Sequence, residues 1–232
     1  MMRMQIGQGD TPTVQHPDLG PVRFHARELG PFPDRQVALT IDVMRERAGE
    51  DAADPVFKSR AQGLAGAGSD LDKTGRLWQH VKRSIKFSRD EPIAQGMNAV
   101  LNPDNVVEII IRPVDMARYV DQGIAIGDCD DFSMYLAALL TANGIACSFI
   151  TVAADGHAPD QYSHVYVVAY PDGERVACDA SHGKYPGWEV PNAFGKIREW
   201  ECADNGGGWL GMVAGVGLVI AGGWLAYRAV AA

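Results

Sequence analysis

Cysteine is scarce in this sequence, and no two cysteines lie close together. No pair has the short spacing of a zinc site or of a dithiol redox site. The sequence therefore gives no support to a metal centre, and we expect neither a metal nor another cofactor. The four cysteines are Cys129, Cys147, Cys178 and Cys202.

Positive charge is also in deficit. Lys and Arg number 21 against 29 Asp and Glu, which gives a formal net charge of -8 at pH 7. Proteins that bind nucleic acid gather basic residues into a patch or stripe. The one basic helix face in this chain is better explained as a solvated surface of an acidic protein. We therefore expect no nucleic-acid partner.

The N-terminus lacks the apolar core of a signal peptide. This absence predicts synthesis in the cytoplasm and reduced thiols. Residues 1–33 are instead rich in Pro, Gly, Asp and His without a sustained period, and they predict an extended arm. The whole chain has 232 residues and is 47% hydrophobic, which is enough for a sizeable core.

The strongest helix signal begins in the stretch 127–133, Gly-Asp-Cys-Asp-Asp-Phe-Ser. Apolar residues then recur at spacings of three and four until Asn143-Gly144, a typical helix end. Cys129 should therefore lie in the first turn of a buried helix. The backbone N–H groups and the helix dipole there favour a thiolate, the form that attacks carbonyls. The alternative is that Cys129 is simply a buried, inert cysteine.

Weaker helical patterns come first in the chain. One helix is expected over about residues 34–48, with Gly49 as its end. A second begins at Asp54-Pro55, an N-cap followed by proline at the first helical position. Together they define a helical extension over residues 34–68.

A stronger helix is expected from Ser69 onward, with Leu71 and Trp78 on its buried face. The apolar run 106–111 predicts either a strand or a packed loop. A short helix is then expected over residues 113–123.

After the central helix, apolar residues alternate with period two. Strands are expected over residues 145–152, 163–170 and 175–181, with a turn at Pro171-Asp172-Gly173. A helical half thus precedes a β half. This order predicts an α+β fold for a domain spanning residues 69–200.

His164 and Asp179 fall on the two strands of the last predicted hairpin. They face each other directly if the turn centres on Pro171-Asp172, and they are diagonal neighbours if it centres on Asp172-Gly173. In both cases they share one sheet face, with Cβ atoms roughly 5–8 Å apart. A cysteine nucleophile needs a base, and the base needs an orienting group. The alternative is a surface histidine beside an unrelated acid.

Four segments carry a resemblance to a known family. GDCDDF, SMYLAALLTANGIAC, SHVYVVAY and VACDAS resemble the transglutaminase-like superfamily of papain-like cysteine enzymes, over roughly residues 70–182. LWQHVKRSIKFSRD also resembles the segment that precedes the cysteine in bacterial and phage members. The resemblance implies a papain-like fold in which Cys129 is the nucleophile, His164 the general base and acid, and Asp179 the orienting group.

The resemblance also implies an oxyanion hole formed in part by the backbone N–H of Cys129. The motif does not identify the second donor. Gln122, seven residues before the cysteine, and Trp78 are the candidates. Trp78 is equally well explained as a core residue.

Some features near the motif depart from this interpretation. Acidic residues at 128, 130 and 131 suit a helix N-terminus, but they also oppose a nearby thiolate. His182 is a rival base. The family often has a His-Ala-Trp-like run and an Asp-Pro-Thr run, where this chain has His164-Val165-Tyr166 and Asp179-Ala180-Ser181. Neither departure removes a catalytic group.

The function implied by the resemblance is cysteine-dependent acyl transfer. Hydrolysis of an amide bond in a peptide, a protein or a cell-wall peptide is the expected reaction, and protein cross-linking by transamidation is an alternative. A further alternative is a catalytically silent structural protein on the same fold, associated with a virion or tethered to a membrane.

The C-terminal region differs in composition from the rest. Residues 201–208 predict a Gly-rich hinge, and residues 209–232 a hydrophobic helix. No residue from Trp209 to Tyr227 is charged, and about 20 apolar residues can span a bilayer. We expect this helix to anchor the chain in a membrane, with burial in an assembly such as a virion as the alternative.

Overall fold

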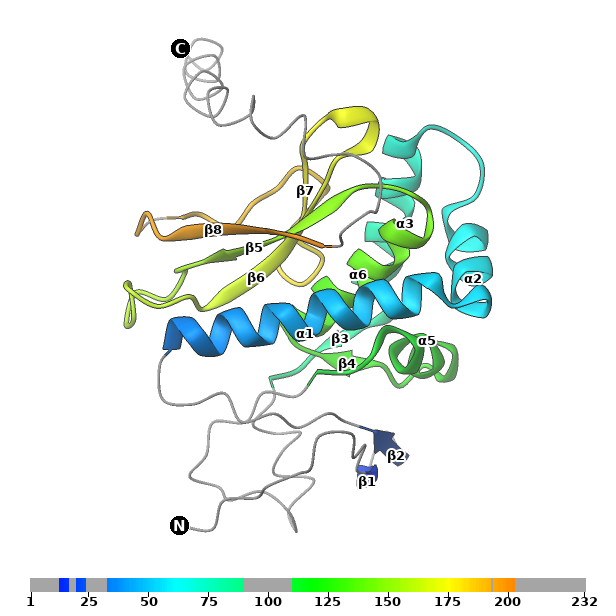
Figure 1. Ribbon diagram of the computed structural model, residues 1–232, viewed down its shortest axis with the longest axis horizontal. Helices are drawn as coiled ribbons and strands as arrows, with labels where there is room; N and C mark the ends of the chain where they lie inside the picture. The colour runs from blue at the N-terminus through cyan, green and yellow to red at the C-terminus, as the bar shows by residue number, and fades with distance from the viewer. Residues whose placement is uncertain (1–12, 17–19, 24–32, 90–109, 193, 203–232) are drawn as a thin grey trace.

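The computed structural model describes residues 13–16, 20–23, 33–89, 110–192 and 194–202 (Figure 1). In this part of the chain the long helices come first and the main antiparallel sheet comes last, which confirms the α+β expectation. The predicted helix at 209–232, most of the hinge, and residues 106–109 lie outside it. No helix among the described residues combines the length and apolar character needed to cross a membrane.

Helix α6 (Cys129–Ala142) lies at the centre of the fold. It packs against the sheet on one side and against four other helices around it, and all but two of its residues are buried. A helix that is apolar nearly all round has no face to give to water and is therefore enclosed. The enclosing helices are α1 (Pro33–Ala53), α2 (Pro55–Ala65), α3 (Asp70–Ser84) and α5 (Pro113–Gln122).

The main sheet has the strand order β7-β6-β5-β8, and every pair is antiparallel. The first three strands fall within the ranges expected from the period-two pattern. The fourth follows a loop and pairs with β5 on the far edge (Figure 1). The bounds are β5 Cys147–Val152, β6 His164–Ala169, β7 Val176–Cys178 and β8 Ile197–Glu201.

Two smaller strand pairs complete the described fold. Strands β1 (Thr13–His16) and β2 (Gly20–Arg23) form an antiparallel hairpin, so the predicted arm is not extended throughout. Strands β3 (Lys86–Phe87) and β4 (Ile126–Gly127) pair in parallel and bring the end of α3 beside the start of α6.

The helix starts follow the expected capping rules. The side chain of Asp54 accepts hydrogen bonds from the first-turn N–H groups of α2. Ser69 forms a capping box with Asp72 at the start of α3, and Asp128 forms one with Asp131 at the start of α6. These predictions are confirmed because a cap depends on residues only two or three positions apart.

Four local predictions were wrong. Gly49 does not end the first helix, which continues to Ala53; the cap at Asp54 sets the boundary instead. Leu71 is 47% exposed, because it lies in the solvated first turn of α3. Cys202, which lies within the predicted Gly-rich hinge, is buried. Residues 197–201, partly assigned to that hinge, form a strand, because β5 offers them a free edge.

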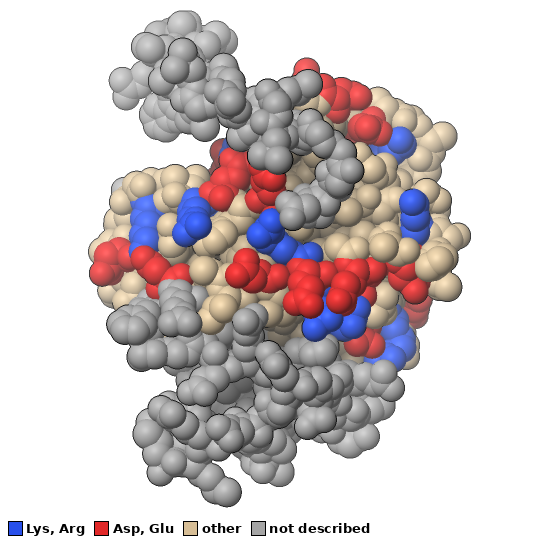
Figure 2. All heavy atoms as spheres, in the orientation of Figure 1, with Lys and Arg blue, Asp and Glu red and all other residues tan. Residues whose placement is uncertain are grey.

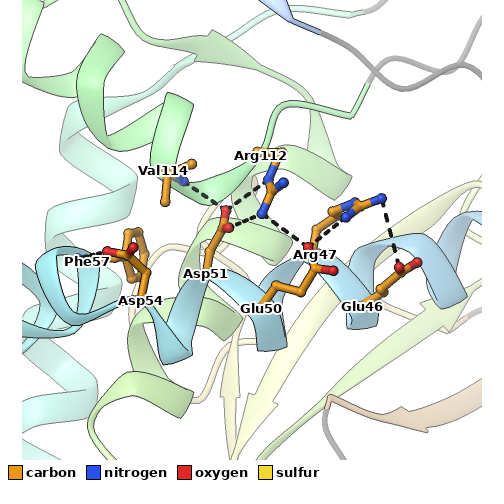
Figure 3. Close-up of polar contacts among 8 residues, drawn as sticks. All are labelled: Glu46, Arg47, Glu50, Asp51, Asp54, Phe57, Arg112 and Val114. Atoms are coloured by element: carbon orange, nitrogen blue, oxygen red, sulfur yellow. Dashed lines mark hydrogen bonds and ion pairs between the residues drawn. The ribbon is translucent and has the colours of Figure 1, made fainter. Parts of the chain in front are cut away.

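A buried acidic residue ties α1 to α5. The carboxylate of Asp51 is almost fully buried and pairs with the guanidinium of Arg112 (Figure 3). The same carboxylate accepts the backbone N–H of Val114 at 3.1 Å, so it caps α5 from another helix. This contact joins α1 to α5.

Charges of both signs are mixed along the face of α1. Figure 2 shows Lys and Arg side chains lying beside Asp and Glu on this face. Two of the contacts are the pairs Arg45–Asp42 and Arg47–Glu50, both within α1. Such exposed pairs contribute little stability each.

Candidate active site

Cys129 is the first residue of α6 and is partly exposed, whereas the helix behind it is buried. The three other cysteines are buried, and none of the four forms a disulfide. Burial raises the pKa of the Cys178 thiol to about 12 and raises that of Cys202 well above its ordinary value. Cys129 is therefore the one cysteine placed both at a helix N-terminus and within reach of solvent.

His164 and Asp179 are in direct contact. Nε2 of His164 lies 2.8 Å from Oδ2 of Asp179, and both side chains are buried. In the hairpin Val167 lies opposite Cys178, which makes His164 and Asp179 diagonal neighbours. The structure thus selects the second of the two predicted registers, with the turn centred on Asp172-Gly173. Both of these turn residues have positive φ.

The carboxylate of Asp179 is held from two sides. Its Oδ1 atom accepts the hydroxyl of Ser181 at 3.0 Å and the backbone N–H of His182 at 2.8 Å, while Oδ2 faces His164. Burial alone would raise the pKa of Asp179, but these hydrogen bonds and the nearby charge of His164 outweigh it and lower the pKa. Asp179 is therefore ionised and firmly oriented at neutral pH.

This contact fixes the tautomer of His164. An ionised carboxylate can only accept hydrogen bonds, so Nε2 of His164 carries the hydrogen that it donates to Asp179. In the neutral ring the other nitrogen, Nδ1, then has a lone pair. That nitrogen is the one able to take a proton from a thiol.

Ser133 connects the cysteine helix to the histidine strand. Its buried hydroxyl lies 2.6 Å from the carbonyl oxygen of Cys129 and 3.2 Å from the carbonyl oxygen of Val165. Both backbones are therefore within hydrogen-bond distance of a single oxygen. Because Val165 follows His164, this contact fixes where α6 begins relative to the histidine. No local pattern distinguishes Ser133 from the other small residues of a buried helix.

Trp78 on α3 holds the backbone of Asp179. Its indole N–H donates to the carbonyl oxygen of Asp179 at 3.0 Å, inside the core. Indole has a single N–H, so donation to an oxyanion would require breaking this bond. Its contact therefore gives Trp78 a positioning role. The oxyanion role of Trp78 stays a prediction, as does that of Gln122, which lies exposed at the end of α5.

The acidic residues around Cys129 have structural partners. Asp131 is fully buried, and its Oδ1 accepts the backbone N–H of Ile111 at 2.7 Å. Asp130 Oδ1 accepts the N–H of Asp131 at 2.7 Å. A Cβ on Gly127 would lie 2.5 Å from Oδ2 of Asp131, which explains why glycine fits at position 127. These carboxylates build the turn that presents Cys129.

His182, the rival base, lies beside the pair but is oriented differently. Its ring meets the ring of His164 edge-on, with 4.8 Å between centroids. Burial and the neighbouring His164 lower the pKa of His182. Its backbone N–H, and not its ring, contacts the Asp179 carboxylate. Asp179 therefore orients the ring of His164 and not that of His182. The loop after Asp179 turns closely enough that a Cβ on Gly183 would lie 2.2 Å from the Asp179 carbonyl oxygen, so only glycine fits there.

Two groups of side chains in the described residues have spacings that a metal ion could use. His164, Asp179 and His182 form one, and Asp128, Asp130 and Asp131 form the other. In both groups carboxylate oxygens already accept protein N–H or O–H groups. This gives each group a structural function without a metal, and the expectation of no cofactor stays a prediction.

No protein-family model and no curated protein matches the chain. Among solved structures, a candidate protease from Parabacteroides distasonis aligns at 14% identity over 75% of this chain and 36% of its own, with a TM-score of 0.41.

Two further alignments are weaker. A candidate cysteine protease from Cytophaga hutchinsonii aligns at 16% identity over 74% of this chain and 51% of its own, with a TM-score of 0.35. Rad4–Rad23 bound to a 6-4 photoproduct UV lesion aligns at 13% identity over 70% and 42% of the two chains, with a TM-score of 0.30. This chain thus spans about half or less of each structure, and we draw no argument from alignments at these scores.

Proposed function

We propose that this chain is a cysteine-dependent acyl-transfer enzyme with a papain-like, transglutaminase-like domain, and that it hydrolyses an amide bond. The observation that carries the proposal is the buried His164–Asp179 pair, joined to the first turn of α6 through Ser133. A histidine with a fixed tautomer, on a strand tied to the first turn of a helix that begins with a cysteine, supplies the groups that nucleophilic catalysis requires.

The proposed reaction begins with transfer of the Cys129 thiol proton to Nδ1 of His164. The thiolate sulfur then attacks the amide carbonyl carbon, and the carbonyl oxygen takes the negative charge. Collapse of this intermediate breaks the C–N bond, and the amine leaves with the proton from His164. A thioester remains on Cys129. Water attacks it while His164 takes a proton from the water. The C–S bond then breaks, the carboxylic acid leaves, and the proton on His164 returns to the Cys129 sulfur.

Asp179 supports both steps without taking up the proton. Its charge stabilises the imidazolium that forms when His164 is protonated, and its hydrogen bond keeps Nδ1 directed away from the carboxylate. The backbone N–H of Cys129 is the proposed oxyanion donor, because it lies at the positive end of α6. The neighbouring acids oppose the thiolate, so the imidazolium has to offset their charge.

The proposal is tested by trapping the thioester. Wild-type protein is incubated with p-nitrophenyl acetate, and mass spectrometry of the digest locates the acetyl group. We expect rapid acetylation at Cys129 and none at the buried cysteines, with loss of the signal in Cys129→Ala and strong slowing in His164→Ala. Equal and slow acetylation in wild type and His164→Ala would refute the enzyme and favour the structural alternative.

The same assay separates hydrolysis from transamidation. After acetylation, the loss of the thioester is followed in water alone and with a primary amine such as putrescine. Release that does not change with amine supports a hydrolase. Release that accelerates with amine, with acetylputrescine as the product, would support the cross-linking alternative.

A further inference from the structure

An exposed aromatic residue is fixed beside the turn that leads into α6. Phe87 in β3 pairs with Gly127, two residues before Cys129. Backbone hydrogen bonds on both sides hold it there, from Lys86 N–H to Ala125 O at 2.9 Å and from Ser88 N–H to Gly127 O at 2.8 Å. Phe87 nevertheless leaves 41% of its surface in solvent. Its position is therefore fixed by the backbone, while part of its ring is open to a ligand.

The Phe87 ring is also linked to the candidate base. Its centroid lies 5.1 Å from that of His182 in an edge-on contact, and His182 in turn meets His164 at 4.8 Å. On its other side the Phe87 ring contacts Phe132 of α6 at 6.4 Å. Phe87, His182 and His164 thus make two consecutive ring contacts, and we call these three residues the aromatic row. Single exposed apolar residues are common on proteins, but this one continues a contact chain that ends at the base.

The reaction chemistry assigns this row to one side of the substrate. His164 must give its proton to the nitrogen of the leaving amine, so that nitrogen has to lie next to the His164 ring. Because His182 contacts both His164 and Phe87, a residue attached to that nitrogen can reach these two rings. The acyl half of the substrate is instead bound to Cys129 and remains after the amine has left. A contact with the aromatic row therefore acts on the leaving group and is absent from the thioester.

We propose that Phe87 and His182 form a subsite for an aromatic or large aliphatic side chain on the residue that follows the cleaved bond. This inference rests on the proposed function and adds the specificity of its leaving-group side. Aromatic rings favour edge-on or offset contacts with one another, which the exposed edge of Phe87 offers. A side chain with a charged end would lose water against the Phe87 ring, which cannot pair with its charge.

The test is cleavage-site profiling on a peptide library prepared from a proteome digest. Wild type, Phe87→Ala, Phe87→Leu and Cys129→Ala are compared, and mass spectrometry identifies the residues before and after each new terminus. We expect wild type to favour Phe, Tyr, Trp and Leu after the cleaved bond by about tenfold or more over Gly and Asp, since a hydrophobic pocket discriminates by about 10- to 200-fold per group. Phe87→Ala should lose that preference and keep the preferences before the bond.

Phe194→Ala is the matched control, because Phe194 is 42% exposed and lies against Gly156 in the loop after β5. It should leave the profile unchanged. Phe87→Leu should retain the aliphatic preference and lose the aromatic one, which separates recognition from misfolding. Circular dichroism of both Phe87 variants should match that of wild type, which would exclude misfolding as the cause of a changed profile.

The outcomes distinguish the two proposals. If Cys129 is acetylated but Phe87→Ala keeps the wild-type preference after the bond, or changes only the preference before it, the subsite is refuted and the enzyme stands. If wild type shows no aromatic or aliphatic preference, the subsite is likewise refuted. If Cys129 is not acetylated and no peptide is cleaved above the Cys129→Ala background, the proposed function fails and the subsite with it.

Discussion

Replacement of Asp179 by asparagine should reverse the orientation of protons on His164. Two donors, the Ser181 hydroxyl and the His182 backbone N–H, converge on Oδ1 of Asp179. An asparagine keeps its oxygen on those donors and turns its NH₂ group toward Nε2 of His164. Nε2 must then accept, so the ring hydrogen moves to Nδ1. That nitrogen can no longer take a proton from Cys129.

The size of the effect follows from the contact that is lost. A hydrogen bond to a charged partner contributes about 1.5–3 kcal/mol, and about 1.4 kcal/mol corresponds to a tenfold change in an equilibrium. Loss of the carboxylate charge should therefore lower the thiolate population of Cys129 by about 10- to 100-fold at pH 6. In the acyl-transfer reaction the wrong tautomer adds to this, and a loss of about 10⁴-fold in rate is expected for such triads.

The assay is the rate of alkylation by iodoacetamide between pH 5 and 9, followed at Cys129 by peptide mapping. In Asp179→Asn we expect the midpoint of the rate profile to rise by about one to two pH units. Asp172→Asn is the matched control, because Asp172 is exposed, has a φ of 53°, and lies in the turn between β6 and β7. Asparagine tolerates such a φ, so this variant makes the same charge change without strain.

The reasoning fails if Asp179→Asn keeps the wild-type profile while circular dichroism shows an intact fold. That result would mean that the His164–Asp179 contact does not control the thiol. If wild-type Cys129 itself reacted only near the pKa of an ordinary thiol, we would likewise conclude that the His164–Asp179 contact does not control it.

Three further changes test the structure around the site. Gly127→Ala should destabilise the fold by about 1–3 kcal/mol in urea unfolding, because the added Cβ meets the Asp131 carboxylate. Gly75→Ala, in an open position on α3, should instead stabilise the fold by about 0.5–1 kcal/mol. Equal effects of the two substitutions would contradict the packing argument. Ser133→Ala should cost about 1 kcal/mol and slow Cys129 alkylation several-fold, and an unchanged alkylation rate would show that Ser133 does not position the nucleophile. The pKa of the Asp179 carboxyl is lowered in the folded state, so the stability that it contributes is present above the unfolded pKa of 3.8 and is lost as the pH falls from there through the folded pKa. Wild type should therefore lose stability more steeply than Asp179→Asn below about pH 4. Parallel losses in the two proteins would refute this linkage.

Much of this fold is determined by short-range sequence signals. The caps at Asp54, Ser69 and Asp128, and the helix end at Asn143-Gly144, each depend on residues within one turn. The buried character of α6 follows from its apolar composition alone. The period-two alternation likewise located three strands of the sheet. These features could be predicted because the interacting groups are close in the chain.

The register of the last hairpin marks the limit of local information. The sequence allowed two turn centres and therefore two relations between His164 and Asp179. The positive φ values of Asp172 and Gly173, together with the pairing of β6 with β7, select the diagonal one. Both registers satisfy the alternation of apolar residues, so only the assembled sheet could choose between them.

Other features depend on residues more than thirty positions apart and have no local signal. Trp78 donates to the backbone of Asp179 across 101 residues of chain, and Ser133 contacts Val165 across 32. Strand β8 forms only because β5 has an unpaired edge beside it. The sequence by itself supplied the residue types of the site and the elements that carry them. The tertiary structure decided which atoms meet, because hydrogen bonds between distant segments form only after packing has set the helices against the sheet.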